Sequence, residues 1–268
     1  MSKKGFFVLF GPPGSGKSTE AAATFPDSLY VMSSPNILQF YENEYLKTPE
    51  AIALGLRMPK RVVCLDKYSI DGRVEMLPTG HPKPVPQKAT LEGILDQAVT
   101  RALIARSKNE PPPWRNLVID EVGTFWPRVY EEIKPTILTR SGSVDTRGAF
   151  GALAEWSRNR TDYLRQLLVC GMNVVLVGHD QEPDPQQEKK GGPKFPSQQI
   201  MREICADADG VLLRGFEDGE LGAPSNRIWI AHGRQNWLSK IRGIPDRMFG
   251  EVKNWHLTKV VTTAGFEP

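Results

Sequence analysis

Residues 11–18 combine glycines, a lysine and a serine at the spacing that a phosphate-binding loop requires. The stretch reads Gly-Pro-Pro-Gly-Ser-Gly-Lys-Ser and directly follows the apolar run at 6–10. Its glycines let successive backbone N–H groups turn toward phosphate oxygens, and the helix expected at 18–24 adds its positive N-terminal end. We expect Lys17 to neutralise the β- and γ-phosphates and Ser18 to hold Mg²⁺. The predicted nucleotide-binding set is Gly11, Pro12, Pro13, Gly14, Ser15, Gly16, Lys17, Ser18 and Thr19.

Two adjacent acids, Asp120 and Glu121, end a second apolar run at 117–119. Three aliphatic residues before a carboxylate predict a buried parallel strand that delivers an acid to the edge of the sheet where ligands bind. We expect Asp120 to complete the Mg²⁺ shell through water, and Glu121 to orient and deprotonate the attacking water. Two solvated acids at a strand end are the alternative.

A histidine follows the apolar run at 173–178. At the tip of a strand beside the Asp120 strand, His179 can sense a γ-phosphate and relay its loss to the next segment. The alternative is a polar loop residue bonded to backbone. The segment that follows, 182–199, is long and lacks periodicity, so it is either a functional loop or a solvated one. Its basic and aromatic residues would suit the phosphates and bases of a single strand, and they are Lys189, Lys190, Lys194 and Phe195.

Two cations follow the last expected strand, at 227–231. They are Lys240 and Arg242. Side chains there cannot easily reach their own phosphate site, but they can reach that of a neighbour in a ring or filament. We therefore expect cationic fingers that act across a subunit interface. A basic surface turn is the alternative.

Alternating strands and helices are expected to position these residues. The apolar runs predict strands at 6–10, 28–32, 61–65, 117–119, 173–178, 210–216 and 227–231. Helical spacing and caps predict helices at 18–24, 36–47, 90–106, 149–170 and 199–206, with loops at 69–88 and 136–150. This pattern predicts an α/β fold with a mostly parallel sheet sandwiched by helices.

Length and composition favour one α/β domain spanning 1–268, with a core at about 5–242 and a tail at 249–268. The 34 basic and 31 acidic residues nearly balance, so any nucleic-acid surface must be local. The three cysteines are widely spaced, which indicates neither a disulfide framework nor a zinc site. The first strand begins at once, leaving no room for a signal peptide, and no apolar run is long enough for a membrane span. We expect a cytoplasmic protein.

The order of these parts resembles the additional-strand P-loop ATPases, in which one strand separates the Asp120 strand from the phosphate-loop strand. Within them the chain is similar to the compact RecA-like ATPases of bacteriophages, of the single-strand annealing (Sak-four) type. The resemblance spans residues 5–242. The matching pieces lie at 10–19, 117–121, 172–179, 208–211 and 240–242.

The resemblance implies a RecA-like core that binds ATP and Mg²⁺ and hydrolyses ATP. It implies a homo-oligomer, as a ring or filament, that binds single-stranded DNA and pairs complementary strands during phage recombination. A single-strand-binding protein would be a further partner, and the bacterial host cytosol the location. By position, 137–149 and 181–199 correspond to the two DNA-binding loops of RecA-like proteins. The implied DNA contacts are Arg140, Arg147, Lys189, Lys190, Lys194 and Phe195.

One departure from the RecA-like pattern keeps other functions open. RecA-like proteins place the catalytic glutamate just after the second strand, whereas this chain has Met32-Ser33-Ser34 there. The Asp120–Glu121 pair instead resembles the AAA+ pattern, in which the catalytic glutamate directly follows the aspartate at the metal site. An AAA+-like phage motor or helicase loader is therefore one alternative, and a slow-hydrolysing nucleotide-dependent binding module is another. ATP is expected rather than GTP because no Asn-Lys-x-Asp element follows 173–178.

Overall fold

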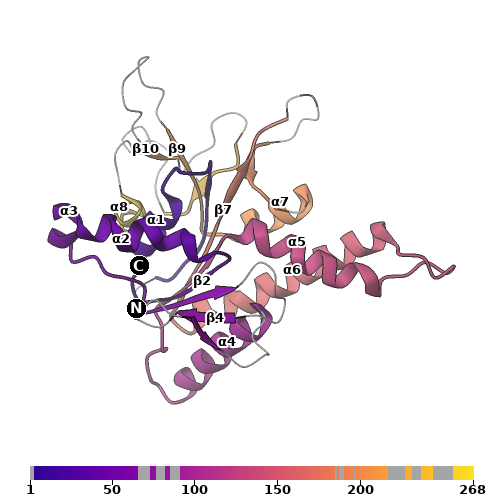
Figure 1. Ribbon diagram of the computed structural model, residues 1–268, viewed down its shortest axis with the longest axis horizontal. Coiled ribbons are helices and arrows are strands. Elements are labelled where there is room, and N and C mark those ends of the chain that lie inside the picture. Colours follow the sequence, from indigo (N-terminus) through magenta and orange to yellow (C-terminus); the bar gives the residue numbers. More distant parts are fainter. Residues whose placement is uncertain are drawn as a thin grey trace.

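The computed structural model describes residues 3–65, 73–76, 82–84, 91–184, 186, 190–195, 197–216, 227–230, 237–243 and 256–268. Its strands form one sheet (Figure 1), in the order β10-β9-β1-β7-β6-β2-β3-β4-β5, with β11 paired to β9 and β8 to β7. The strands are β1 (Phe6–Gly11), β2 (Ser28–Met32), β3 (Arg61–Leu65), β4 (Arg73–Met76), β5 (Pro82–Pro84), β6 (Asn116–Asp120), β7 (Asn173–Gln181), β8 (Gly192–Pro193), β9 (Gly210–Phe216), β10 (Arg227–Ile230) and β11 (Lys240–Ile241). The five central pairings, from β9 to β3, are parallel.

Helices cover both faces of this sheet. They are α1 (Lys17–Thr24), α2 (Gln39–Asn43), α3 (Pro49–Ala53), α4 (Leu91–Ser107), α5 (Val122–Ile133), α6 (Thr146–Val169), α7 (Gln198–Asp207) and α8 (Leu257–Thr263), with 3₁₀ turns η1 (Pro35–Leu38), η2 (Tyr45–Lys47) and η3 (Lys134–Thr136). Side chains of β1 alternate between the faces, as strand geometry requires. Phe6 and Val8 pack with α4–α7, whereas Phe7 and Leu9 pack with α1, α2 and α8. The sandwiched α/β fold is confirmed.

The order of the central strands brings the predicted chemical residues to one edge. β7 lies between β1 and β6 and is parallel to both. Gly11 therefore stands beside His179, and Asp120 beside Val177. The additional strand expected between β1 and β6 is present.

Helices α5 and α6 extend away from the sheet and are joined by a segment that projects from the body (Figure 1). The ring of Tyr130 stacks on Phe150 with centroids 4.5 Å apart, and Leu138 bridges Val144. Asp145 then caps α6 by accepting a hydrogen bond from the Gly148 N–H at 2.9 Å. We call residues 137–145 the arm.

Several predicted boundaries were wrong. The helix expected at 36–47 is broken, because Pro35 starts a 3₁₀ turn and Glu44, with φ near −124°, interrupts helical geometry after α2. The loop expected at 69–88 contains β4 and β5, and α6 begins at Thr146 rather than 149. β7 continues to Gln181, so His179 lies within the strand instead of after it.

The cysteines Cys64, Cys170 and Cys205 are buried thiols that are not joined in disulfides. Among the helices that the structure describes, none combines the length and apolar character needed to cross a membrane.

The buried Asn173 side chain joins three parts of the fold. Its Oδ1 accepts from the Gly5 N–H (2.8 Å), and its Nδ2 donates to Asn116 Oδ1 (2.7 Å) and to the Glu267 carbonyl (2.8 Å). Asn173→Ala removes all three hydrogen bonds and takes away the partner of the Gly5 N–H and of Asn116 Oδ1, so we expect the free energy of unfolding to fall by about 3 kcal/mol. Urea unfolding measures this change. Asn43→Ala, at an exposed site, is the matched control, and an equally small change in both variants contradicts the prediction.

Candidate functional site

The P-loop, residues 11–18, turns between the end of β1 and the start of α1. Gly14 and Gly16 have φ of 74° and 89°, in the left-handed region that favours glycine, and Gly16 is the N-cap residue of α1. A Cβ atom at Gly14 would meet nothing within 4 Å, so this side of the loop is open. The loop therefore presents its backbone to a cavity at the N-terminus of a helix, where anions bind.

Lys17 is buried at 6% exposure, and its Nζ donates to the carbonyl oxygens of Gly11 and Pro12, both at 2.9 Å. Burial lowers the pKa of this ammonium, while Glu121 and Asp120 oppose that shift. The lysine is thus held over the loop, close to both acids.

Asp120 ends β6 as a fully enclosed carboxylate at 1% exposure. The hydroxyl of Tyr30, in neighbouring β2, donates to its Oδ2 at 2.6 Å. Burial raises the pKa of Asp120 to about 6, although hydrogen bonds from Tyr30 and Ser18 favour the ionised form. The predicted metal residues, Ser18 and Asp120, are therefore within hydrogen-bond reach of each other.

Glu121 is held at two points by His179. The His179 backbone N–H donates to Oε1 at 2.9 Å, and the His179 Nε2 lies 3.0 Å from Oε2. Burial and the nearby Lys17 lower the pKa of His179, so a neutral imidazole donates its Nε2 proton. Burial also raises the pKa of Glu121, which makes its carboxylate a stronger base than an exposed glutamate.

These residues line one cavity of about 450 Å³. Its lining includes Lys17, Asp120, Glu121 and His179, together with Pro13, Gly14, Gly16, Ser18, Thr19, Ile37 and Phe40. Sequence reasoning missed Phe40, whose half-exposed ring (51%) offers the cavity an apolar surface. It also missed Tyr30, although a tyrosine in an apolar strand next to the acid-bearing strand was an available signal.

The expected DNA contacts fall into two groups. Arg140, on the arm, and Arg147, in the first turn of α6, are exposed, as are Lys190 and Lys194 in the segment after β7. The Lys194 N–H donates to the His179 carbonyl at 2.8 Å, which ties that segment to the cavity. Lys189 lies outside the described residues.

The expectation that Phe195 is available to stack on a base was wrong. Its ring is 6% exposed and packs edge-on against Trp126 of α5, with centroids 5.7 Å apart. The apolar core between α5 and the sheet holds this ring, so the chain is anchored there at Phe195.

Lys240 and Arg242 lie on the side of β9 away from the P-loop. Lys240 Nζ donates to the Ala206 carbonyl at 2.7 Å, and Arg242 pairs with Asp209 at 3.2 Å. Both therefore have partners in their own chain, and their role at a neighbour's site stays a prediction.

The groups in the cavity fit a magnesium nucleotide. The P-loop supplies backbone donors and a lysine, and Ser18 and Asp120 supply the oxygen ligands that Mg²⁺ prefers. Ser15 Oγ, in the same loop, is buried and has no hydrogen-bond partner among the described residues. A phosphate oxygen would satisfy such a donor.

One family model matches most of this chain. The family described as an AAA domain matches residues 3–242. Among solved structures, the chain is similar to a KaiC-like protein of the hyperthermophilic archaeon Pyrococcus horikoshii OT3. The identity is 13% and the TM-score 0.41, over 89% of this chain and 82% of that one. No curated protein matches the sequence.

The raised pKa of Asp120 predicts a gain in stability on its neutralisation. The folded chain binds the Asp120 proton more tightly than the unfolded chain, so the buried carboxylate destabilises the fold above about pH 6. We expect Asp120→Asn to raise the free energy of unfolding at pH 8, without Mg²⁺, by about 2 to 3 kcal/mol, since one pKa unit is worth about 1.4 kcal/mol.

The gain should disappear between about pH 6 and pH 4, where the folded chain binds this proton. Urea unfolding across this range measures it. Asp162→Asn, at an exposed acid of α6, is the control. Equal stability of Asp120→Asn and the unchanged chain at pH 8 would contradict the assignment.

Proposed function

We propose, given that this chain belongs to the AAA domain family and is a P-loop nucleotide-binding protein, that it is a Mg²⁺-dependent ATPase coupled to single-stranded DNA. The observation that carries the ATPase proposal is the position of Glu121. It lies in the same cavity as Lys17 and Asp120, and His179 fixes both of its carboxylate oxygens.

The P-loop would bind the phosphates through backbone N–H groups and Lys17. Bound Mg²⁺, held by Ser18 and by Asp120 through water, would neutralise charge on the phosphates. Glu121 would orient a water molecule and accept its proton as the water attacks the γ-phosphate. His179, as a neutral donor to Glu121, keeps that carboxylate in place during the step.

The DNA proposal is supported by exposed cations on two segments, one of which is hydrogen-bonded to a residue of the cavity. Arg140 and Arg147 lie on and beside the arm, and Lys190 and Lys194 lie after β7. Because Lys194 is hydrogen-bonded to His179, a change at Glu121 on hydrolysis can pass to the second segment within two contacts. Exposed cations of this kind bind a nucleic-acid backbone.

In its most specific form, the proposed function is that of a phage-type recombination ATPase, which works as a homo-oligomer and pairs complementary single strands. Its support is the resemblance of the motif order and the cations just described. A single-strand-binding protein is the expected partner.

A motor or helicase loader that acts on protein or duplex DNA is the second candidate. It is favoured by the glutamate that directly follows Asp120 and by membership of the AAA domain family. Both candidates need ATP hydrolysis, and they differ in the polymer that stimulates it.

Removing the base should separate binding from hydrolysis. Glu121→Gln keeps the size of the side chain and one acceptor but cannot take a proton, so we expect ATP affinity to be retained and turnover to fall by at least about a hundredfold. A fluorescent ATP analogue measures binding, and phosphate release measures turnover. Glu155→Gln, at an exposed site on α6, is the control. Unchanged turnover in Glu121→Gln would reject the role of the base.

Reversing the charge after β7 should weaken DNA binding. In Lys190→Glu/Lys194→Glu we expect affinity for a single-stranded oligonucleotide to fall at least about tenfold. The salt slope should decrease by about 0.7 for each DNA phosphate that the variant no longer neutralises. Fluorescence anisotropy at several salt concentrations measures both quantities. Lys47→Glu, at an exposed site on η2, is the control. If both variants bind DNA alike, this segment does not contact DNA.

A further inference from the structure

Arg214 is a charged residue in a strand that is otherwise apolar and small. β9 reads Gly-Val-Leu-Leu-Arg-Gly-Phe, and the Arg214 side chain is 6% exposed. A buried guanidinium is costly unless it is paired and hydrogen-bonded. Arg214 has no role in the hydrolysis proposed above. Its role is therefore inferred from the groups that it contacts.

The guanidinium of Arg214 contacts the P-loop and the helix that follows. Its Nε donates to the Ser15 carbonyl at 3.3 Å, and its Nη2 lies 3.3 Å from Glu20 Oε1. The ring of Trp229, from β10, lies under the guanidinium at 5.0 Å from its centroid. The backbone takes part as well, because a Cβ atom at Gly11 would overlap the Arg214 carbonyl oxygen. Arg214 therefore contacts the P-loop at two points, Gly11 and the Ser15 carbonyl.

Glu20 places a buried negative charge in the first turn of α1, the helix whose N-terminus forms the expected phosphate site. It lies on α1 two residues after Ser18, with a carboxylate that is 8% exposed. Such a charge favours an empty helix N-terminus, but it opposes an anion bound there. Neutralising Glu20 would therefore favour a phosphate bound at the N-terminus of this helix.

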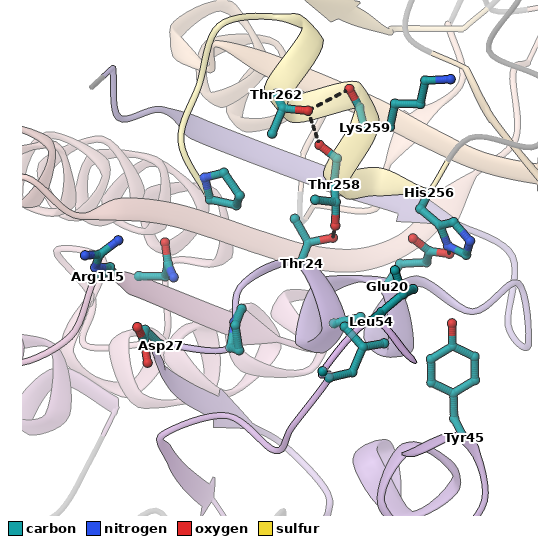
Figure 2. A pocket seen from close by; sticks show the side chains of 16 residues that line it. Glu20, Thr24, Asp27, Tyr45, Leu54, Arg115, His256, Thr258, Lys259 and Thr262 are labelled. Carbon is teal, nitrogen blue, oxygen red and sulfur yellow. Dashed lines mark hydrogen bonds and ion pairs between the residues drawn. The ribbon is translucent and has the colours of Figure 1, made fainter. Parts of the chain in front are cut away.

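Two other groups meet the same carboxylate. The Leu257 N–H donates to Oε2 at 2.8 Å, and His256 Nδ1 lies 3.3 Å from Oε1. Figure 2 shows the Glu20 and His256 side chains together in the wall of a cavity of about 670 Å³. The His256 side chain is half exposed, and its other nitrogen faces Glu50 at 3.1 Å, so solvent and a second acid weaken its effect on Glu20. Against the effect of burial, the hydrogen bond from His256 and the charge of Arg214 both lower the pKa of Glu20. Arg214 is the buried counter-charge that stays positive at every pH.

We propose that Arg214 is a positioning residue of the nucleotide site, which holds the Ser15 carbonyl in the P-loop and neutralises Glu20 so that its charge does not oppose the phosphates. This inference rests on the proposed function in one respect, that a nucleotide phosphate binds at residues 11–18. Its other part, support of the loop, concerns the free chain. The two parts can therefore be tested separately.

A double-mutant cycle tests whether Arg214 neutralises Glu20. The variants Arg214→Gln, Glu20→Gln and the double variant are compared with the unchanged chain by titration with a fluorescent ATP analogue. We expect Arg214→Gln to raise the Kd at least about tenfold, because Glu20 then loses its buried counter-charge. Glu20→Gln should bind at least as tightly as the unchanged chain. The double variant should recover most of the loss.

Hydrogen exchange on the nucleotide-free chain tests the support of the loop. Arg214→Gln should speed exchange of the amides in the P-loop and α1, while those of β2, which Arg214 does not contact, keep their rate. Thermal unfolding of each variant reports the stability of the whole fold. A general loss of stability, with β2 affected as much as the P-loop, would overturn the positioning role.

The outcomes distinguish the two proposals. An unchanged Kd in Arg214→Gln, or a loss that Glu20→Gln does not relieve, overturns the neutralisation. If Arg214→Gln does not fold, Glu20→Gln decides alone, since a weaker Kd in that variant contradicts the proposed opposition of charges. If the unchanged chain binds no ATP, the proposed function and the neutralisation fall together, and only the support of the loop, read by exchange, stands.

Discussion

The parallel pairing of β7 with β1 on one side and β6 on the other is the constraint on which the nucleotide site depends. Parallel strands in register end at a common edge, and here that edge carries the P-loop, Asp120 and His179. A register shift of one residue would turn Asp120 toward the opposite face of the sheet. The long apolar runs of the three strands are thus what holds polar residues from three distant parts of the chain together.

The same pairing explains which features could be predicted from sequence. The P-loop and the strands around it have local patterns, a glycine spacing in one case and continuous apolar runs in the other, so residue types alone identify them. The tip of β7 was harder to predict. His179, Asp180 and Gln181 are polar, and they remain in the strand because β1 and β8 pair with them.

Long-range packing accounts for the rest of the misses. Phe195 lies in a basic, glycine-rich segment, and only the position of Trp126 on α5 shows that its ring is buried. Arg214 acts on Ser15, 199 residues earlier in the chain, so no local pattern connects them. An arginine within an apolar strand was nevertheless a visible irregularity. Such a residue needs a partner, and the sequence cannot say which one.

The site contains several charged side chains in a region with little access to water. Asp120 and Glu121 are both raised in pKa by burial, and each is held by a neutral donor, Tyr30 or His179. Glu20, by contrast, is paired with a full positive charge. This difference suits their proposed roles: a metal ligand and a base must remain available, whereas an acid in the first turn of the phosphate-binding helix is better neutralised.

Steady-state turnover of the unchanged protein is the sharpest test of the proposal that ATP hydrolysis by this chain is coupled to single-stranded DNA. Phosphate release is measured with Mg²⁺ alone, with a single-stranded oligonucleotide, and with the same sequence as a duplex. We expect basal hydrolysis that the single strand increases and that the duplex does not. Hydrolysis that is absent under all three conditions, or that the single strand leaves unchanged, would contradict it.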